Sequence, residues 1–246
     1  MTLPLANKIA LVTGASRGIG RATARLLAEA GAHVVALART TGGLEELDDE
    51  IKKAGGSATL VPADMRDFAA FDRLGASLAE RYGRLDVLVG NAGQLGTLTP
   101  LPHIEPKEWD EVMAVNVTAN WRLIRSLDPL LRAAEAGRAV FVTSSITYKA
   151  RAYWGTYAVS KIALELLART YAAETAETKV KVNLFNPGPI RTRMRAKAMP
   201  GEDPMTLDTP EQAAEKLIEL CLPACAVSGM LYDYPQKKFL QFQPPA

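Results

Sequence analysis

The stretch that decides the fold class of this chain is TGASRGIG, residues 13–20. Its glycines, Gly14, Gly18 and Gly20, are spaced G-x-x-x-G-x-G, unlike the common G-x-G-x-x-G fingerprint. The stretch follows an apolar run and precedes a helical pattern. A glycine turn in that context leaves backbone N–H groups and a helix N-terminus free to hold a pyrophosphate. We therefore predict a dinucleotide-binding loop, the alternative being a plain glycine-rich turn.

Strand-like and helical patterns alternate along the rest of the chain. Short runs rich in Val, Leu and Ile are typical of strands buried on both faces, and their alternation with helices favours a parallel sheet. We expect a single domain over 1–246, with a Rossmann-type doubly wound parallel sheet of about seven strands and helices on both faces. The expected strands are 8–14, 33–39, 58–64, 85–93, 138–145, 180–188 and 229–234. The expected helices are 21–31, 43–56, 68–83, 106–137, 154–175 and 209–222, and 191–208 is expected to be an irregular, mobile segment.

The composition of the 246 residues excludes several classes of protein. With 29 basic and 27 acidic residues the formal charge is +2, which gives no indication of a nucleic-acid partner. No secretory signal and no apolar stretch of membrane-spanning length is found. Cys221 and Cys225 are interpreted as apolar packing residues, because His33 and His103 are both distant in sequence. We expect a cytoplasmic protein without metal, nucleic acid or membrane partner.

The end of the second expected strand indicates which dinucleotide binds. Such folds usually place an Asp or Glu about 20 residues after the loop to bind the ribose 2′-hydroxyl. Here Ala38 and Arg39 stand at that end, and Arg17 lies within the glycine loop itself. Two guanidinium groups suit a 2′-phosphate, which a carboxylate would repel. We therefore expect NADP(H) in preference to NAD(H), the alternative for Arg39 being an ordinary solvated charge.

A second motif, YAVSK at 157–161, suggests catalysis. Tyr157 and Lys161 stand one helical turn apart on one face, and a nearby ammonium favours the phenolate of a tyrosine. Tyr157 is then a candidate general acid or base. Such a pair alone is common on solvated helices, but the fifth expected strand ends upstream in Thr143–Ser144–Ser145. Because strand ends line the ligand crevice of such sheets, a hydroxyl there is placed to bind a substrate carbonyl.

Together these motifs resemble those of the compact, single-domain short-chain dehydrogenases/reductases. The segments TGASRGIG, NAG (91–93) and NPGPIRT (186–192), with the Ser–Tyr–Lys set, occur in that family's order over roughly residues 6–235. RAYWGTYAVSK and RTRMRAKAMP further resemble a group of bacterial oxidoreductases. The resemblance implies hydride transfer between NADP(H) and a small-molecule carbonyl or secondary alcohol. It also implies a homodimer or homotetramer.

The resemblance implies roles for single residues. Tyr157 is the proton donor in reduction and the base in oxidation, while Lys161 lowers the pKa of Tyr157 and binds the nicotinamide ribose. Asn116 is the fourth catalytic position and holds a water in a proton relay, the alternative being a satisfied core amide. The expected cofactor-binding residues are Gly14, Ser16, Arg17, Gly18, Ile19, Gly20, Arg39, Asp64, Asn91, Ala92, Gly93, Tyr157, Lys161, Pro187, Gly188, Ile190 and Thr192.

Three points stay open in the sequence. The family's catalytic serine commonly precedes the tyrosine by 13 residues, which selects Ser144, but a loop one residue shorter selects Ser145. Neighbouring strand residues point in opposite directions, so both cannot serve equally. The C-terminal part lacks the family's frequent Gly-Gly, which leaves its contacts undefined. The alternative function is a non-catalytic, redox-sensing NADP-binding protein, although such proteins often lose the Tyr–Lys pair.

Overall fold

An eight-stranded sheet forms the centre of the protein, seen in a computed structural model that describes residues 3–242. Its strand order is β3-β2-β1-β4-β5-β6-β7-β8, and every neighbouring pair is parallel except β7 with β8. The strands are β1 (Ile9–Thr13), β2 (His33–Ala38), β3 (Ser57–Pro62), β4 (Val87–Gly90), β5 (Arg138–Val142), β6 (Lys181–Asn186), β7 (Leu231–Asp233) and β8 (Lys238–Leu240).

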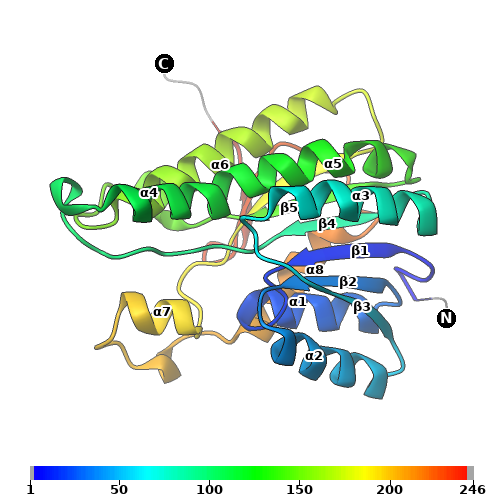
Figure 1. Cartoon of the computed structure of the whole chain (residues 1–246), viewed down its shortest axis with the longest axis horizontal. Coiled ribbons are helices and arrows are strands. Elements are labelled where there is room, and N and C mark those ends of the chain that lie inside the picture. Colours follow the sequence, from blue (N-terminus) through cyan, green and yellow to red (C-terminus); the bar gives the residue numbers. More distant parts are fainter. Residues whose placement is uncertain (1–2, 243–246) are drawn as a thin grey trace.

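Helices cover both faces of this sheet, which confirms the predicted doubly wound arrangement (Figure 1). They are α1 (Gly18–Glu29), α2 (Thr41–Lys53), α3 (Phe68–Tyr82), α4 (Pro106–Met113), α5 (Ala119–Ala133), α6 (Gly155–Glu174), α7 (Arg193–Ala198) and α8 (Pro210–Cys221). Figure 1 shows α3, α4, α5 and α6 on one side of the sheet and α1 and α2 on the other.

Two apolar cores follow from the alternation of side chains along each strand. In β1, Leu11 belongs to the core under α3, α5 and α6, whereas Ala10 and Val12 belong to the core under α1, α2 and α8. All five residues of β1 are buried, as expected for a central parallel strand. Cys221 is buried in the second core, in agreement with the packing interpretation, whereas Cys225 is half-buried and belongs to neither core.

The structure differs from the sequence-based expectation in three places. The sheet has eight strands rather than about seven, because the three-residue strand β8 pairs antiparallel with β7 and is too short for a periodic signal. The helix expected over 106–137 is divided into α4 and α5 by a π-helical turn at Ala114–Thr118. The segment 191–208 contains α7, whose first turn is capped by the Thr192 hydroxyl accepting from the Arg195 N–H.

Candidate active site

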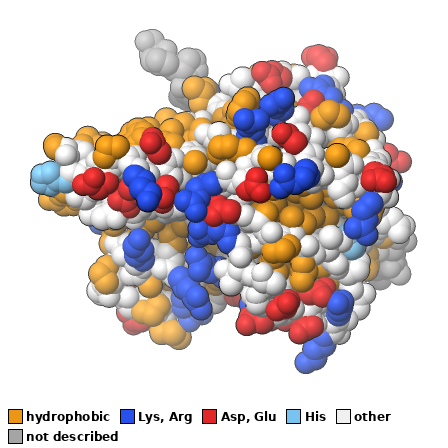
Figure 2. Space-filling view, viewed as in Figure 1, with side chains coloured by type: hydrophobic (Ala, Val, Ile, Leu, Met, Phe, Trp, Pro, Cys, Tyr) orange, Lys and Arg blue, Asp and Glu red, His pale blue; other side chains and the backbone are white. Residues whose placement is uncertain are grey.

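A cavity of about 870 Å³ opens at the carboxyl ends of β1, β2, β4, β5 and β6. The strands β1 and β4 are neighbours, but after β1 the chain continues to helices on one face of the sheet and after β4 to helices on the other. The crevice between two such strands is the switch point where sheets of this kind bind ligands. Figure 2 shows Lys and Arg side chains gathered along the hollow beside the part of the molecule that carries α7. Of the residues predicted for the site, all line this cavity except Gly20 and Asn116.

The glycine loop lies at one end of the cavity and has steric reasons for its glycines. Gly14 and Gly18 have φ values of +68° and +57°, in the left-handed region that side chains rarely adopt. A Cβ built at Gly20 would overlap the side-chain amide of Asn91. That amide donates to the backbone carbonyl of Thr13 at 2.9 Å, so the turn after β4 lies directly against the loop.

Thr13, which the sequence analysis did not single out, ties these two turns together. Its hydroxyl oxygen accepts from the N–H groups of Asn91 and Ala92, each at 3.0 Å, and donates to the carbonyl of Val89 at 3.3 Å. The side chain is fully buried. Thr13 could have been identified from its position in the sequence, because it ends a strand directly before Gly14 and the glycine loop.

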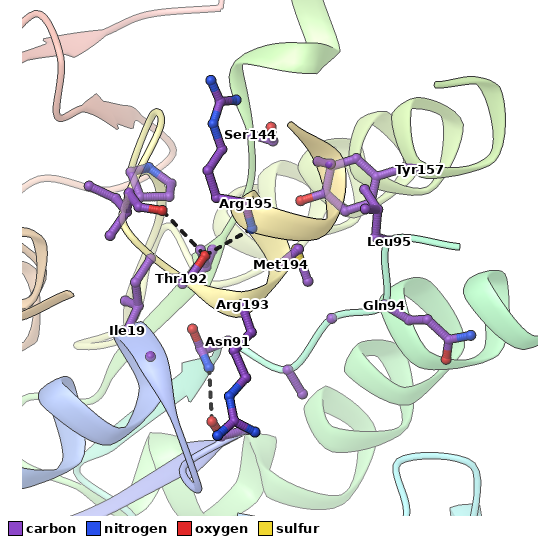
Figure 3. Close-up of a pocket in the computed structure, with 18 of the residues that line it drawn as sticks. Ile19, Asn91, Gln94, Leu95, Ser144, Tyr157, Thr192, Arg193, Met194 and Arg195 are labelled. Atoms are coloured by element: carbon purple, nitrogen blue, oxygen red, sulfur yellow. Dashed lines mark hydrogen bonds between the residues drawn. The ribbon is translucent and has the colours of Figure 1, made fainter. Parts of the chain in front are cut away.

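Tyr157 lies at the other end of the cavity with its hydroxyl directed into the space (Figure 3). The residue is 8% exposed, and burial raises its pKa to about 12, against the lowering effect of a hydrogen bond with Ser144. This direction is opposite to the lowering expected from Lys161. The reason is that removing a phenolate from water costs more than the Ser144 hydrogen bond returns.

Lys161 lies beside Tyr157, as their spacing on α6 predicts. Its Nζ is 5.7 Å from the centre of the Tyr157 ring and donates to the carbonyl of Val142 at 2.8 Å. Burial lowers the pKa of Lys161 to about 8, and the negative charge of Glu165 acts in the opposite direction. A proton on Lys161 is therefore held far less tightly than on a solvated lysine.

Of the two candidate serines, the structure brings Ser144 to Tyr157. The Ser144 side chain acts on the Tyr157 hydroxyl by lowering its pKa, and its oxygen accepts from the Ile146 N–H at 3.4 Å. Ser145 begins a 3₁₀ turn and its side chain bonds that of Tyr148 instead. The separation arises because the backbone changes from extended at Ser144 to helical at Ser145.

Asn116 lies in the π-helical turn, fully buried and outside the cavity lining. Its Oδ1 accepts from the Gln94 N–H at 2.8 Å, and its Nδ2 donates to the Gln94 carbonyl and the Ser160 hydroxyl, each at 2.9 Å. These contacts fit the satisfied core amide and join the turn after β4 to α6. π-helical turns are frequent at functional sites, and the relay role remains a prediction.

Comparison with known proteins decides the family. The model of the short chain dehydrogenase family matches residues 8–203. The chain belongs to this family. The oxidoreductase YciK of Escherichia coli K12 is 40% identical over 209 residues, covering 84% of this chain and 82% of that protein. This confirms the resemblance to bacterial oxidoreductases of the short-chain dehydrogenase family.

Solved short-chain dehydrogenase structures have the same fold. One from Salmonella enterica serovar Typhi CT18 has a TM-score of 0.91 at 36% identity, covering 95% of this chain and 98% of that chain. A second, from Escherichia coli CFT073 and complexed with NADPH, has a TM-score of 0.88 at 37% identity, covering 95% of this chain and 99% of that chain. In this chain, no helix between residues 3 and 242 has the length and apolarity to cross a membrane.

The end of the cavity beside the glycine loop and the end of β2 is cationic, which fits the dinucleotide of the family. Arg17 is exposed on the glycine loop and pairs with no carboxylate of the described residues. Arg39 is 3.8 Å from Asp64, whose pKa is lowered chiefly by a bidentate hydrogen bond from Arg66. Asp64 is thus already held by Arg66, and the guanidinium of Arg39, 59% exposed, remains available to a ligand.

The turn that follows β6 and lines the cavity is held by contacts with β7 and the residues after it. Gly188, with φ +67°, donates its N–H to the Asn186 side chain at 3.1 Å. The Asn186 amide in turn donates to the buried carboxylate of Asp233 at the end of β7. Pro235 packs so closely on Gly188 that a Cβ there would overlap it. These are contacts of the C-terminal part that the sequence had left undefined.

Glu165 is a buried acid that the sequence analysis missed. It is 7% exposed and accepts from the Thr143 hydroxyl at 2.7 Å. Burial raises its pKa, and Lys161 acts in the opposite direction. The signal in the sequence was the spacing of four residues from Tyr157 to Lys161 and again from Lys161 to Glu165, which puts all three on one face of α6.

Proposed function

We propose that this chain is an NADP(H)-dependent oxidoreductase that interconverts a carbonyl compound and a secondary alcohol. The observation that carries the proposal is that one cavity holds the glycine loop at one end and Ser144, Tyr157 and Lys161 at the other. When bound, the dinucleotide supplies or accepts the hydride at C4 of its nicotinamide. The chain supplies binding, orientation and the proton.

Each of the three side chains has a role in the reduction. The Ser144 hydroxyl donates a hydrogen bond to the carbonyl oxygen, and Tyr157 protonates that oxygen as it gains charge. With its pKa raised to about 12, Tyr157 holds its proton at neutral pH and is ready to act as an acid. Lys161, one turn along α6, stabilises the resulting phenolate until a proton returns from solvent. Asn116 completes the proposed relay.

The cofactor preference rests on the cationic adenosine end of the cavity. Arg17 and Arg39 offer two guanidinium groups and no acid of this loop and strand end competes for the ribose 2′-position. A structural relative was solved with NADPH, which agrees with this preference. Replacing both arginines by alanine should weaken NADPH binding by roughly tenfold or more and leave NADH binding nearly unchanged.

The experiment that tests the function is Tyr157→Phe, assayed on a panel of ketones, aldehydes and secondary alcohols with NADPH or NADP. Wild type should turn over members of the panel, whereas the variant should lose turnover and keep its NADPH affinity. Turnover by the variant at the wild-type rate would refute the acid–base role. If wild type binds NADPH and converts nothing, the redox-sensing alternative is favoured.

The proposed assembly is a homodimer or homotetramer through α5 and α6. Trp121 on α5 and Val159, Ile162 and Leu166 on α6 are large apolar side chains that are 42–59% exposed. Covering such side chains is a usual reason for a second copy to dock. Sedimentation of wild type and Leu166→Glu tests this proposal, and monomeric wild type would contradict it. A cytoplasmic location, as expected from the sequence, stays a prediction.

A further inference from the structure

The substrate side of the cavity combines an apolar floor with a cationic rim. Around Tyr157 the floor is a separate small cluster built from Leu95, Ile146 and Ala198, with Trp154 packed against it. Six cations from the segments next to this floor line the cavity: Lys149, Arg151, Arg191, Arg193, Arg195 and Lys197. Glu108 is the acidic residue that lines the same side. The local excess of positive charge contrasts with the near-balanced chain as a whole.

These cations differ in the contacts that their charged groups already make within the chain. Arg195 is bonded by the carboxylate of Glu202, so its charge is compensated within the chain. Arg193 extends toward the end of the cavity that holds Asn91 (Figure 3), which places it near the proposed cofactor side. Arg151 and Arg191 pair with no carboxylate among residues 3–242. Arg191 lies with its Nη1 3.1 Å from the sulfur of Met205, whereas Arg151 lies over Trp154, which packs on the apolar floor.

Arg151 is nevertheless held in a definite position. Its guanidinium carbon lies 5.4 Å from the centre of the Trp154 ring, and its Nη2 lies 3.9 Å from the sulfur of Met199. The Trp154 ring meets the Tyr157 ring edge-on, with centres 6.1 Å apart. A stacked guanidinium loses less rotamer entropy when it binds an oxyanion, and here the Trp154 ring connects it to the ring of Tyr157.

We propose that the substrate of this enzyme carries a carboxylate or phosphate group and that Arg151 is the specificity-determining residue that binds it. The reacting carbonyl lies at Ser144 and Tyr157, the carbon skeleton covers Trp154, and the anionic group meets Arg151 at the rim. The inference rests on the proposed function, because it presumes that Tyr157 marks the reacting centre. Lys149 and Lys197 add to the attraction without a bidentate geometry.

The test uses substrates that differ only in charge. Benzoylformate and its methyl ester, together with matched acid and ester pairs of aliphatic 2-oxo and 3-oxo compounds, are assayed with NADPH. Wild type should show the higher kcat/KM for the acid of a pair. Arg151→Gln should raise KM for the acid about tenfold, with kcat and the ester values changed less than about twofold.

Arg81→Gln is the matched control, since Arg81 is also exposed and stacked, 5.6 Å from the centre of the Tyr82 ring, but lies outside the cavity. It should leave both substrates unaffected. An ester preferred by wild type, or an equal effect of Arg151→Gln on acid and ester, would overturn the anionic substrate while leaving the reductase intact. No turnover of any pair by a wild type that converts other carbonyl compounds would overturn the anionic substrate alone. No turnover of any carbonyl compound or alcohol would overturn the proposed function and this inference with it.

Discussion

Replacing Lys161 by methionine should stabilise the protein at neutral pH even though it removes a proposed catalytic group. Burial lowers the pKa of Lys161 from 10.5 to about 8. At about 1.4 kcal/mol per pKa unit, the charged ammonium costs the folded state about 3 kcal/mol at pH 7. Methionine has a similar size and no charge, but it leaves the carbonyl of Val142 without its donor, at a cost of about 1 kcal/mol. The free energy of unfolding of Lys161→Met should therefore exceed that of wild type by about 2 kcal/mol.

The sign and pH window of this effect follow from the two pKa values. Below pH 8 the lysine is protonated in both states, so the full cost is present. Between pH 8 and 10.5 the folded state releases its proton first, and the unfolded state binds more protons. The free energy of unfolding of wild type therefore rises across this window, while that of Lys161→Met does not rise with it. The difference in favour of the variant disappears and then becomes slightly negative.

Urea unfolding of both proteins at intervals from pH 7 to pH 10 measures the difference. Protein concentration must be kept constant, because association between copies would shift apparent stability. Lys53→Met, at an exposed position near the end of α2, is the control and should change stability by less than about 0.5 kcal/mol at every pH. The reasoning is refuted if Lys161→Met is less stable than wild type at pH 7, or if the difference is the same at both ends of the range.

Two further predictions concern other parts of the site. Gly20→Ala should abolish NADPH binding or folding, because its Cβ would overlap the Asn91 amide, whereas Gly42→Ala, with nothing within 4 Å, should be tolerated; equal NADPH affinities would contradict the steric argument. Glu165→Gln should lower the pKa of Lys161, because the carboxylate that favours its charged form is lost. Its pH–rate profile for reduction should then shift to lower pH at unchanged NADPH affinity, and an unmoved profile would show that Glu165 does not act on Lys161.

Features that depend on near neighbours in the chain were predictable. The glycine loop was identified because Gly14 and Gly18 serve local backbone conformations between a strand and a helix. Tyr157 and Lys161 were paired because residues four apart on a helix share a face. The order of strands and helices followed from apolar periodicity in the same way. Within residues 3–242, strand β8 and the short helix α7, with three and six residues, escaped it, as did the π-helical turn at Ala114–Thr118.

The sequence by itself therefore determined the fold class, the phosphate-type loop and the Tyr–Lys pair. Tertiary structure alone selected Ser144 over Ser145 as the neighbour of Tyr157, and it brought Arg151 to Met199. It also decided that burial raises the pKa of Tyr157 rather than Lys161 lowering it. The physical reason is common to all three. Desolvation and side-chain contact depend on segments that meet only when the ends of several strands converge, which no local pattern of residues records.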